Sequence, residues 1–419
     1  MLQQKIRPAF GPLIGQVTVP GSKSLSNRAL LLAALAEGVT HLKGLLWSDD
    51  TEACFVALQS LGVPLEKISE HELRVTGVRA FRSQQKIDCR DAGTVSRFLI
   101  PMAAALGGVY EFYGSARLSE RPLKPMLDGL IAQGVKIEYQ GQAGFLPLRL
   151  ESTGLSGGVL NVDIRDSSQF VSGLLLAAPK AQAPLTIFAD HLSTKPYVRV
   201  TLEMMADFGV QSELQEHAVQ VQPGTYQACD YAIEPDASTA SYFFAAAALT
   251  GGEILVKGLH RQVLQGDIRF LEVLEKMGAE ILETATGVMV KGPQVLRGLG
   301  QIDFTGMSDT FMTLAALCPF ADAPTTITGL RHTRLQESDR VEAMREGLTR
   351  LGAQVTTTED SITIYPSVLH GGVIDSYRDH RIAMSHALIG LRVPDVVIDG
   401  ADCVKKTCPQ FFALLASLY

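Results

Sequence analysis

Six strongly apolar runs recur along the chain, and each begins directly after a short group of small polar residues. The runs occupy residues 29–35, 98–106, 171–178, 240–249, 311–317 and 382–389. They recur about every 70 residues, which is the signature of an internal repeat. Because a helix that is apolar all round has no face to offer to water, the pattern predicts six buried helices.

A glycine marks a second position in phase with these runs. It follows an amphipathic stretch and precedes a stretch of alternating polar and apolar residues, at Gly62, Gly134, Gly209, Gly278 and Gly352. A glycine between a helix and a strand is typical of a helix C-terminus, where the chain turns through the left-handed conformation. Each repeat is therefore predicted to hold a buried helix, an amphipathic helix and several strands.

The repeat indicates an α/β fold in which sheets surround buried helices. Six units divide into two domains of three. One is expected to be an inserted domain of residues 21–236, and the other to join residues 1–20 to residues 237–419, with a hinge where the chain crosses twice. The alternating stretch 15–19 is expected to complete the sixth unit beside a C-terminal helix over 409–418. A fold of this kind does not by itself define a chemistry.

Composition excludes several classes of function. The 419-residue chain is 46% hydrophobic with a net charge of −7, so it lacks the basic excess of a nucleic-acid-binding domain. No run of about 20 apolar residues and no signal-peptide-like N-terminus occurs, so we expect no membrane span. The six cysteines are scattered without metal-site spacing, which favours a cytoplasmic protein with no metal. No P-loop or dinucleotide-binding glycine motif occurs, so no nucleotide cofactor is expected.

The starts of the apolar runs carry candidate chemistry. A helix N-terminus offers unpaired N–H groups and a partial positive charge, and small residues there let an anion approach the backbone. Basic residues gather at or near the same places and in polar loops, and they are Lys23, Arg28, Arg97, Arg121, Arg340, Arg381, Lys405 and Lys406. In an acidic protein this recurrence indicates a binding site for a small molecule with several negative charges.

Two carboxylates are candidates for proton transfer. Asp309 stands at the start of an apolar run, where a helix N-cap is the ordinary role and is compatible with that of a general base. Glu337 lies among polar residues, where a surface salt bridge is the default expectation. His380, beside Arg381, is either a general acid or a structural histidine, and the structural role is slightly favoured.

Several short motifs together resemble one family. They are residues 20–28 (PGSKSLSNR), 92–94 (AGT) with Arg97, 120–122 (ERP), 167–170 (SSQF), 195–197 (KPY), 337–340 (ESDR), 379–384 (DHRIAM) and Lys406-Thr407 before Pro409. In this combination and order they are similar to the 5-enolpyruvylshikimate-3-phosphate synthases. The resemblance spans essentially the whole chain, although each motif alone would be weak.

The resemblance implies a fold and a reaction. The fold is an inside-out α/β barrel of two domains, each of three βαβαββ-type units, which close on substrates held in the cleft between them. The reaction transfers the enolpyruvyl group of phosphoenolpyruvate to the 5-hydroxyl of shikimate 3-phosphate and releases phosphate through a tetrahedral intermediate. It belongs to the shikimate pathway of aromatic amino acid biosynthesis. The resemblance implies a monomer with small-molecule substrates and neither metal nor cofactor.

The resemblance also implies a role for each matching residue. Asp309 would be the base and Glu337 the acid, with Lys23 assisting. Binding of shikimate 3-phosphate would fall to Lys23, Ser24, Arg28, Ser167, Ser168, Gln169, Thr194, Tyr197, Asp309 and Gln336. Binding of phosphoenolpyruvate would fall to Lys23, Gly93, Arg121, Gln169, Arg340, Arg381 and Lys406.

The chain departs from the family pattern at five of these positions or beside them. Thr194 stands where Ser is usual, Gln336 where Lys is common, His332 and Asp91 where Asn is common, and Phe98 where Pro is frequent. The loss of a cation at Gln336 would weaken charge complementarity to the acceptor or alter its choice. We expect Asp91 to bond to backbone or to Arg97, and Phe98 to affect the position of Gly93.

Three alternatives stay open at this point. A sister enolpyruvyl transferase acting on UDP-N-acetylglucosamine typically has Asn where this chain has Ser24, and a loop cysteine that residues 113–120 lack. Gln336 and Asp91 leave room for the same chemistry on another anionic alcohol. A non-catalytic repeat protein would explain the periodicity but not the joint presence of Lys23, Asp309 and Glu337.

Overall fold

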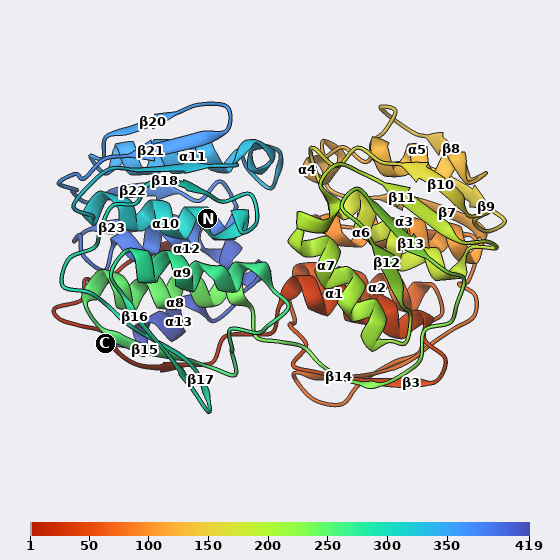
Figure 1. The fold of residues 1–419 in the computed structure, drawn as a ribbon, viewed down its shortest axis with the longest axis horizontal. Coiled ribbons are helices and arrows are strands. Elements are labelled where there is room, and N and C mark those ends of the chain that lie inside the picture. Colours follow the sequence, from red (N-terminus) through yellow and green to blue (C-terminus); the bar gives the residue numbers. More distant parts are fainter. Residues whose placement is uncertain (1) are drawn as a thin grey trace. The chain divides into compact units, whose positions relative to one another are not determined.

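The computed structural model describes residues 2–419 and divides into two compact units. One unit, called the inserted unit below, is Gly21–Ile233. The other, called the split unit, joins Met1–Pro20 to Glu234–Tyr419. Both chain ends therefore belong to the split unit, as the N and C marks in Figure 1 show. No helix of the described residues is long and apolar enough to span a bilayer.

Three four-stranded sheets of one topology form the outside of the inserted unit. In each, a parallel pair of strands is followed by two antiparallel neighbours. In spatial order they are β14 (Asp230–Ala232), β3 (Val39–Lys43), β5 (Glu72–Thr76) and β4 (Leu65–Lys67); β6 (Gln85–Asp88), β7 (Gly108–Tyr113), β9 (Leu148–Ser152) and β8 (Lys136–Tyr139); and β10 (Gly158–Asn161), β11 (Leu185–Phe188), β13 (Ala218–Val221) and β12 (Ser212–Leu214).

The split unit repeats this arrangement. Its sheets are β2 (Ile14–Val17), β15 (Glu253–Lys257), β17 (Gly287–Lys291) and β16 (Glu280–Thr284); β18 (Gly300–Asp303), β19 (Thr325–Thr328), β21 (Ser361–Ile364) and β20 (Val355–Thr357); and a three-stranded sheet of β22 (Gly372–Asp375), β23 (Val396–Asp399) and β1 (Gln3–Lys5). Two of these sheets each contain one strand from the N-terminal segment: β2 pairs with β15, and β1 pairs with β23.

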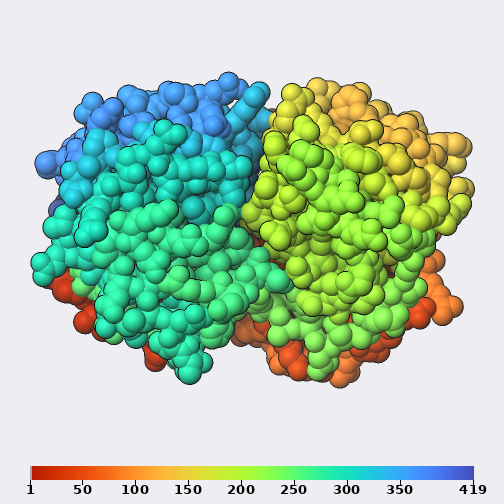
Figure 2. All heavy atoms as spheres, viewed as in Figure 1, coloured from red at the N-terminus to blue at the C-terminus, as the bar shows by residue number. Residues whose placement is uncertain are grey.

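One strand lies elsewhere than expected. The alternating stretch near residues 15–19 does form β2, but β2 pairs in parallel with β15 in the fourth sheet and not in the sixth. The sixth sheet is completed by β1, which pairs antiparallel with β23. Figure 2 shows the red N-terminal residues along the lower edge of the split unit. The alternation predicted a strand correctly, but it contains no information about the partner, because pairing is a long-range property.

Six buried helices fill the two units as the apolar runs predict. They are α1 (Lys23–Leu35), α3 (Gly93–Leu106) and α6 (Gln169–Ala177) in the inserted unit, and α8 (Ala237–Thr250), α10 (Phe311–Leu317) and α12 (His380–Ile389) in the split unit. Nearly every residue of these helices is buried. Helices inside and sheets outside confirm the predicted α/β class.

The remaining helices are the partly exposed partners of the buried ones. They are α2 (Asp49–Ser60), α4 (Ala116–Ser119), α5 (Lys124–Ala132), α7 (Pro196–Asp207), α9 (Phe270–Lys276), α11 (Arg340–Arg350) and α13 (Phe411–Ala416). Short 3-10 helices join them: η1 (Ala178–Lys180), η2 (Leu192–Thr194), η3 (Gly266–Arg269), η4 (Ser308–Thr310), η5 (Cys318–Phe320), η6 (Arg331–Leu335) and η7 (Ala401–Lys406). The five in-phase glycines all have positive φ and follow α2, α5, α7, α9 and α11, which confirms their role at helix ends.

Candidate active site

Three helix starts meet in the inserted unit. The helices α1, α3 and α6 begin at Lys23, Gly93 and Gln169, and the residue before each makes no side-chain cap hydrogen bond. Side chains tie the starts together. Asn27 of α1 donates to Thr94 of α3 (Nδ2 to Oγ1, 3.0 Å), and Arg97 of α3 donates to Gln169 of α6 (Nη1 to Oε1, 2.9 Å). Three partial positive charges therefore lie at one end of neighbouring helices.

Arg121 is held over the start of α3. A Cβ atom at Gly93 would lie 2.8 Å from Nη1 of Arg121, so a larger residue there would displace the guanidinium from this position. Arg97 lies close by: burial, and then the charge of Arg121, hold the pKa of Arg97 well below its ordinary value. Two like charges this close favour an anion as a third partner.

Lys23 and Arg28 project from the first turns of α1. The ammonium of Lys23 lies 3.4 Å from a carboxylate oxygen of buried Asp50 on α2. Arg28 is fully buried; its Nε donates to Thr201 (2.8 Å), its Nη1 to the Ser24 carbonyl (3.0 Å) and its Nη2 to the Tyr197 carbonyl (3.4 Å). Burial lowers the pKa of Arg28 to about 10. The side chain thus joins α1 to the start of α7.

The predicted phosphate-binding hydroxyls lie at the starts of α6 and α7. Ser167 and Ser168 directly precede α6, and the hydroxyl of Ser167 accepts from the Gln169 amide (3.3 Å). Thr194 ends η2, which leads into α7, and it is exposed with its hydroxyl donating to the His191 carbonyl (2.9 Å). The serines adjoin the helix start directly, whereas Thr194 reaches the neighbourhood through η2.

Asp309 in the split unit lies between two arginines. Its Oδ1 accepts from Nη1 of Arg340 and its Oδ2 from Nη2 of Arg381, each at 2.9 Å. The side chain of Asp309 is 17% exposed, while those of the arginines are 3% and 7% exposed. Asp309 does not cap α10, because it sits within η4 and α10 begins two residues later. The two arginines, and not the start of α10, therefore hold the Asp309 side chain.

Glu337 makes more contacts than a surface salt bridge would. One carboxylate oxygen, Oε1, lies 3.1 Å from Nζ of Lys406, and the other, Oε2, lies 2.9 Å from Nδ1 of His380. Nη2 of Arg340 is 3.8 Å from Oε2. The Glu337 side chain is 16% exposed and the His380 side chain is fully buried. A partly buried carboxyl beside a buried imidazole is suited to proton transfer.

Asp379 fixes Arg340 from behind. It accepts from Nε of Arg340 (2.8 Å), from the Ser338 hydroxyl (3.0 Å) and from the Arg381 amide at the start of α12 (3.0 Å). Burial is the largest effect and raises the pKa of Asp379, but the charge of Arg340, the charge of His380 and the hydrogen bond from Arg340 together lower the pKa below its ordinary value. Gln336 also accepts from Nη1 of Arg340. The aspartate is therefore a fixed anion that orients the arginine.

Sequence reasoning missed Asp50 and Ser338 and did not assign Asp379. Asp379 could have been found, because an aspartate before an apolar run favours the N-cap position that it does occupy. Asp91 was expected on backbone or Arg97, but it hydrogen-bonds to Ser115. Phe98 lies under the guanidinium of Arg28, with the Cζ atom 4.7 Å from the ring centroid.

One group of side chains has the spacing of a metal site. Ligand atoms of Glu337, Asp379 and His380 lie within 4.8 Å of one another. Arg340 and Lys406 already lie against both carboxylates, so a divalent cation would meet two fixed positive charges. The donor set therefore fits an internal network of ion pairs better than a metal.

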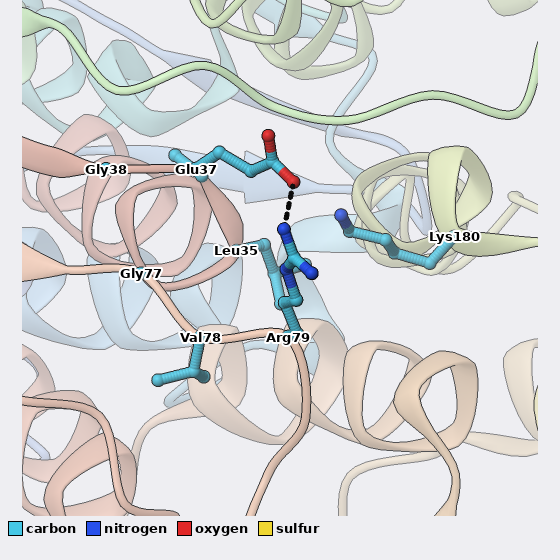
Figure 3. A pocket seen from close by; sticks show the side chains of 8 residues that line it. Leu35, Glu37, Gly38, Gly77, Val78, Arg79 and Lys180 are labelled. Atoms are coloured by element: carbon cyan, nitrogen blue, oxygen red, sulfur yellow. Dashed lines mark hydrogen bonds and ion pairs between the residues drawn. The ribbon is translucent and has the colours of Figure 1, made fainter.

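A cavity of about 220 Å³ lies elsewhere in the inserted unit, near the end of α1. Figure 3 shows Glu37 and Arg79 facing each other across an ion pair, with Lys180 beside them. Burial lowers the pKa of Lys180. The other residues that line the cavity are Leu35, Ala36, Gly38, Gly77 and Val78. None of the predicted site residues lines it.

Comparisons with known proteins agree with this chemistry. The family model "EPSP synthase (3-phosphoshikimate 1-carboxyvinyltransferase)" matches residues 9–415. The 3-phosphoshikimate 1-carboxyvinyltransferase 2 of Halalkalibacterium halodurans is 42% identical, covering 97% of this chain and 92% of that protein. The 3-phosphoshikimate 1-carboxyvinyltransferase of Nostoc punctiforme is 41% identical, covering 96% and 95%. A solved EPSP synthase structure from Acinetobacter baumannii superimposes with a TM-score of 0.84 at 28% identity, covering 100% of this chain and 98% of that one.

Proposed function

Because this chain belongs to the EPSP synthase family, we propose that the groups described in its two units carry out that family's reaction on one pair of substrates. The reaction transfers the enolpyruvyl group of phosphoenolpyruvate to the 5-hydroxyl of shikimate 3-phosphate and releases phosphate. The assignment of residues rests on one observation in the split unit. Asp309 lies between Arg340 and Arg381. Glu337 lies beside Lys406 and His380.

The inserted unit binds shikimate 3-phosphate. Its phosphate lies at the start of α6, where Ser167, Ser168 and the uncapped helix end offer donors, with Thr194 nearby. Arg28 keeps Tyr197 and Ser24 in place, because its guanidinium donates to both backbone carbonyls. Gln169 is fixed by Arg97 and faces the same substrate. In the split unit, Gln336 contacts the acceptor where a lysine is common.

Cations of both units bind phosphoenolpyruvate. Arg121 and the α3 start at Gly93 supply one group, with Lys23 and Gln169. Arg340, Arg381 and Lys406 supply the other, and these cations are paired with Asp309 and Glu337. Guanidinium groups bind carboxylate and phosphate in the same bidentate way, so the substrate anion takes over cations that the two acidic side chains hold.

That exchange activates Asp309. While two guanidinium groups flank Asp309, they stabilise its negative charge and disfavour its protonation. When the arginines turn to phosphoenolpyruvate, Asp309 becomes the acceptor of the proton from the attacking 5-hydroxyl. Glu337 donates a proton to the methylene carbon of the enol, with Lys23 assisting.

Addition and elimination use the same two groups. In the addition, a C–H bond forms at the methylene carbon, a C–O bond forms at the neighbouring carbon, and the hydroxyl proton passes to Asp309. In the elimination, the new methyl group loses a proton and the C–O bond to phosphate breaks, so acid and base exchange roles. The surrounding cations stabilise the charge of the phosphate as it leaves.

We propose further that the enzyme works as a cytoplasmic monomer. All the groups needed for the reaction come from one chain, so no second copy is required. The six cysteines are thiols in the described residues, which suits a reducing compartment. Light scattering coupled to gel filtration should give the mass of one 45.2 kDa chain, and a mass of two chains would contradict the monomer.

The test of the function is phosphate release. Purified protein with phosphoenolpyruvate and shikimate 3-phosphate should release phosphate, and phosphoenolpyruvate alone should not. Asp309→Ala serves as the inactive reference in the same assay. Release that requires another alcohol in place of shikimate 3-phosphate would contradict the proposed substrate.

A further inference from the structure

Asp267 is a buried acid that the reaction described above leaves without a role. It lies in η3, it is 6% exposed, and its carboxylate accepts a hydrogen bond from the hydroxyl of Ser238 in the first turn of α8. The element η3 packs against η4, which carries Asp309. Ionisation of a carboxyl group that is buried away from water and accepts a single hydrogen bond costs free energy.

The charges around Asp267 belong to the active site. Asp309 exerts the strongest charge effect on it, followed by Arg381 on α12 and more weakly by Asp236, which caps α8. Arg269 of η3 and the charged residues of neighbouring α9, namely Glu272, Glu275 and Lys276, are exposed. The electrostatic partner of Asp267 is therefore the aspartate that serves as the base.

Resting on the proposed function, we infer that Asp267 is a positioning residue that tunes the proton affinity of Asp309 through space. When Asp267 is ionised, repulsion between the two carboxylates makes a proton on Asp309 more favourable, and the base becomes stronger. When Asp267 is protonated, that repulsion disappears and Asp309 becomes a weaker base.

Asp267 is expected to gain or lose its proton near neutral pH. Burial first, and then the charge of Asp309, raise the pKa of Asp267 to about 7, against the opposing effects of Arg381 and the Ser238 hydrogen bond. The two acids titrate as a pair, so the enzyme should show a rise in kcat through about pH 7 that belongs to the pair.

The kinetic test compares two variants whose effects differ in kind. Asp267→Asn is neutral at every pH, so the rise in kcat near pH 7 should vanish and kcat at pH 8 should fall roughly 3- to 10-fold, with KM for both substrates nearly unchanged. Ser238→Ala removes the donor that lowers the pKa of Asp267, so the rise should move to higher pH. The exposed Asp303→Asn on the same unit is the matched control.

A second readout does not depend on turnover. Between pH 4 and 7 the folded protein keeps the proton on Asp267 while the unfolded chain has lost it, so this group makes stability fall as pH rises. Asparagine mimics the protonated acid. The Tm of Asp267→Asn minus that of the wild type should therefore increase from pH 4 to pH 7, and Asp303→Asn should show no such trend.

The two readouts separate failure of this inference from failure of the proposed function. If the wild type does not turn over shikimate 3-phosphate, the function is wrong, but the Tm comparison still reports whether Asp267 holds its proton. A parallel Tm dependence in Asp267→Asn and wild type would overturn the inference. So would an unchanged pH dependence of kcat in both Asp267→Asn and Ser238→Ala.

Discussion

Arg340 contacts three acidic side chains at once. It donates to Asp309 and Asp379 at 2.9 and 2.8 Å, and Glu337 lies 3.8 Å away. Asp379 is fully buried and fixed, whereas Asp309 and Glu337 are partly exposed. The arginine can therefore exchange its exposed partners for a substrate anion while Asp379 keeps its orientation. This difference in exposure is why we assign a structural role to Asp379 and propose catalytic roles for Asp309 and Glu337.

Removal of either reactive carboxylate should abolish most turnover. Asp309→Ala and Glu337→Ala should each lower kcat at least about 100-fold, because each removes a proton-transfer group. Both side chains are partly exposed, so circular dichroism should show that the fold is retained, with a modest fall in Tm because buried Arg340 loses one of its partners. The exposed Glu359→Ala in the same unit is the control. Near-normal kcat in either variant would remove that residue from the mechanism.

Gln336 offers a test of acceptor recognition. Gln336→Lys should lower KM for shikimate 3-phosphate, because it places a cation where the family commonly has one and the substrate carries several negative charges. The gain should be limited to roughly 10-fold, since the lysine stands beside Arg340, which Gln336 now contacts as a neutral acceptor. Steady-state kinetics with varied shikimate 3-phosphate measures it. An unchanged or higher KM would show that Gln336 does not face the acceptor.

At the scale of elements, the two units prepare their helix starts differently. The helices α1, α3 and α6 have no side-chain cap, whereas Asp236 and Asp379 cap α8 and α12. An uncapped start can bind an anion with its own N–H groups, while a capped start already holds a carboxylate. Under the proposed function, the inserted unit would bind anions with backbone as well as side chains and the split unit with arginine and lysine, although α10 of the split unit also lacks a side-chain cap.

Close packing of α3 on α6 sets the position of Arg97 and Gln169. A Cβ at Gly173 of α6 would lie 2.0 Å from the Arg97 carbonyl oxygen, so the two backbones touch. Gly173→Ala should lower the free energy of unfolding by about 1–3 kcal/mol or more, because backbone cannot move aside cheaply. Urea unfolding measures it, with Gly224→Ala in the same unit as the control, since its nearest neighbour would be 3.9 Å away. Equal stability of the two variants would contradict this packing.

The sequence predicts elements better than it predicts partners. Apolar runs and in-phase glycines correctly gave buried helices and helix ends, because both signals are local. The prediction of the sheet to which β2 belongs was wrong, because strand pairing depends on residues far along the chain. The buried pairing of Asp379 with Arg340 and the packing of η3, which carries Asp267, against η4, which carries Asp309, also lay beyond the sequence, because each depends on tertiary packing.

The proposed reaction needs groups from both units of the molecule. Ser168→Ala in the inserted unit should raise KM for shikimate 3-phosphate roughly 10- to 100-fold, as expected for the loss of a hydrogen bond to a charged group. Arg381→Lys in the split unit should mainly raise KM for phosphoenolpyruvate, because the bidentate contact is lost. Both constants are read from the same two-substrate kinetics. If the two variants did not differ in which substrate's KM they raise, the assignment of one substrate to each residue would be contradicted.

The most direct test of the central claim is a ³¹P NMR time course of the wild-type protein with phosphoenolpyruvate and shikimate 3-phosphate. We expect the phosphoenolpyruvate signal to be replaced by inorganic phosphate in equal amount, while the phosphomonoester of the acceptor persists at a new shift. Asp309→Ala should leave both substrates unchanged. Persistence of both substrate signals with the wild type, or phosphate release that does not need shikimate 3-phosphate, would contradict it.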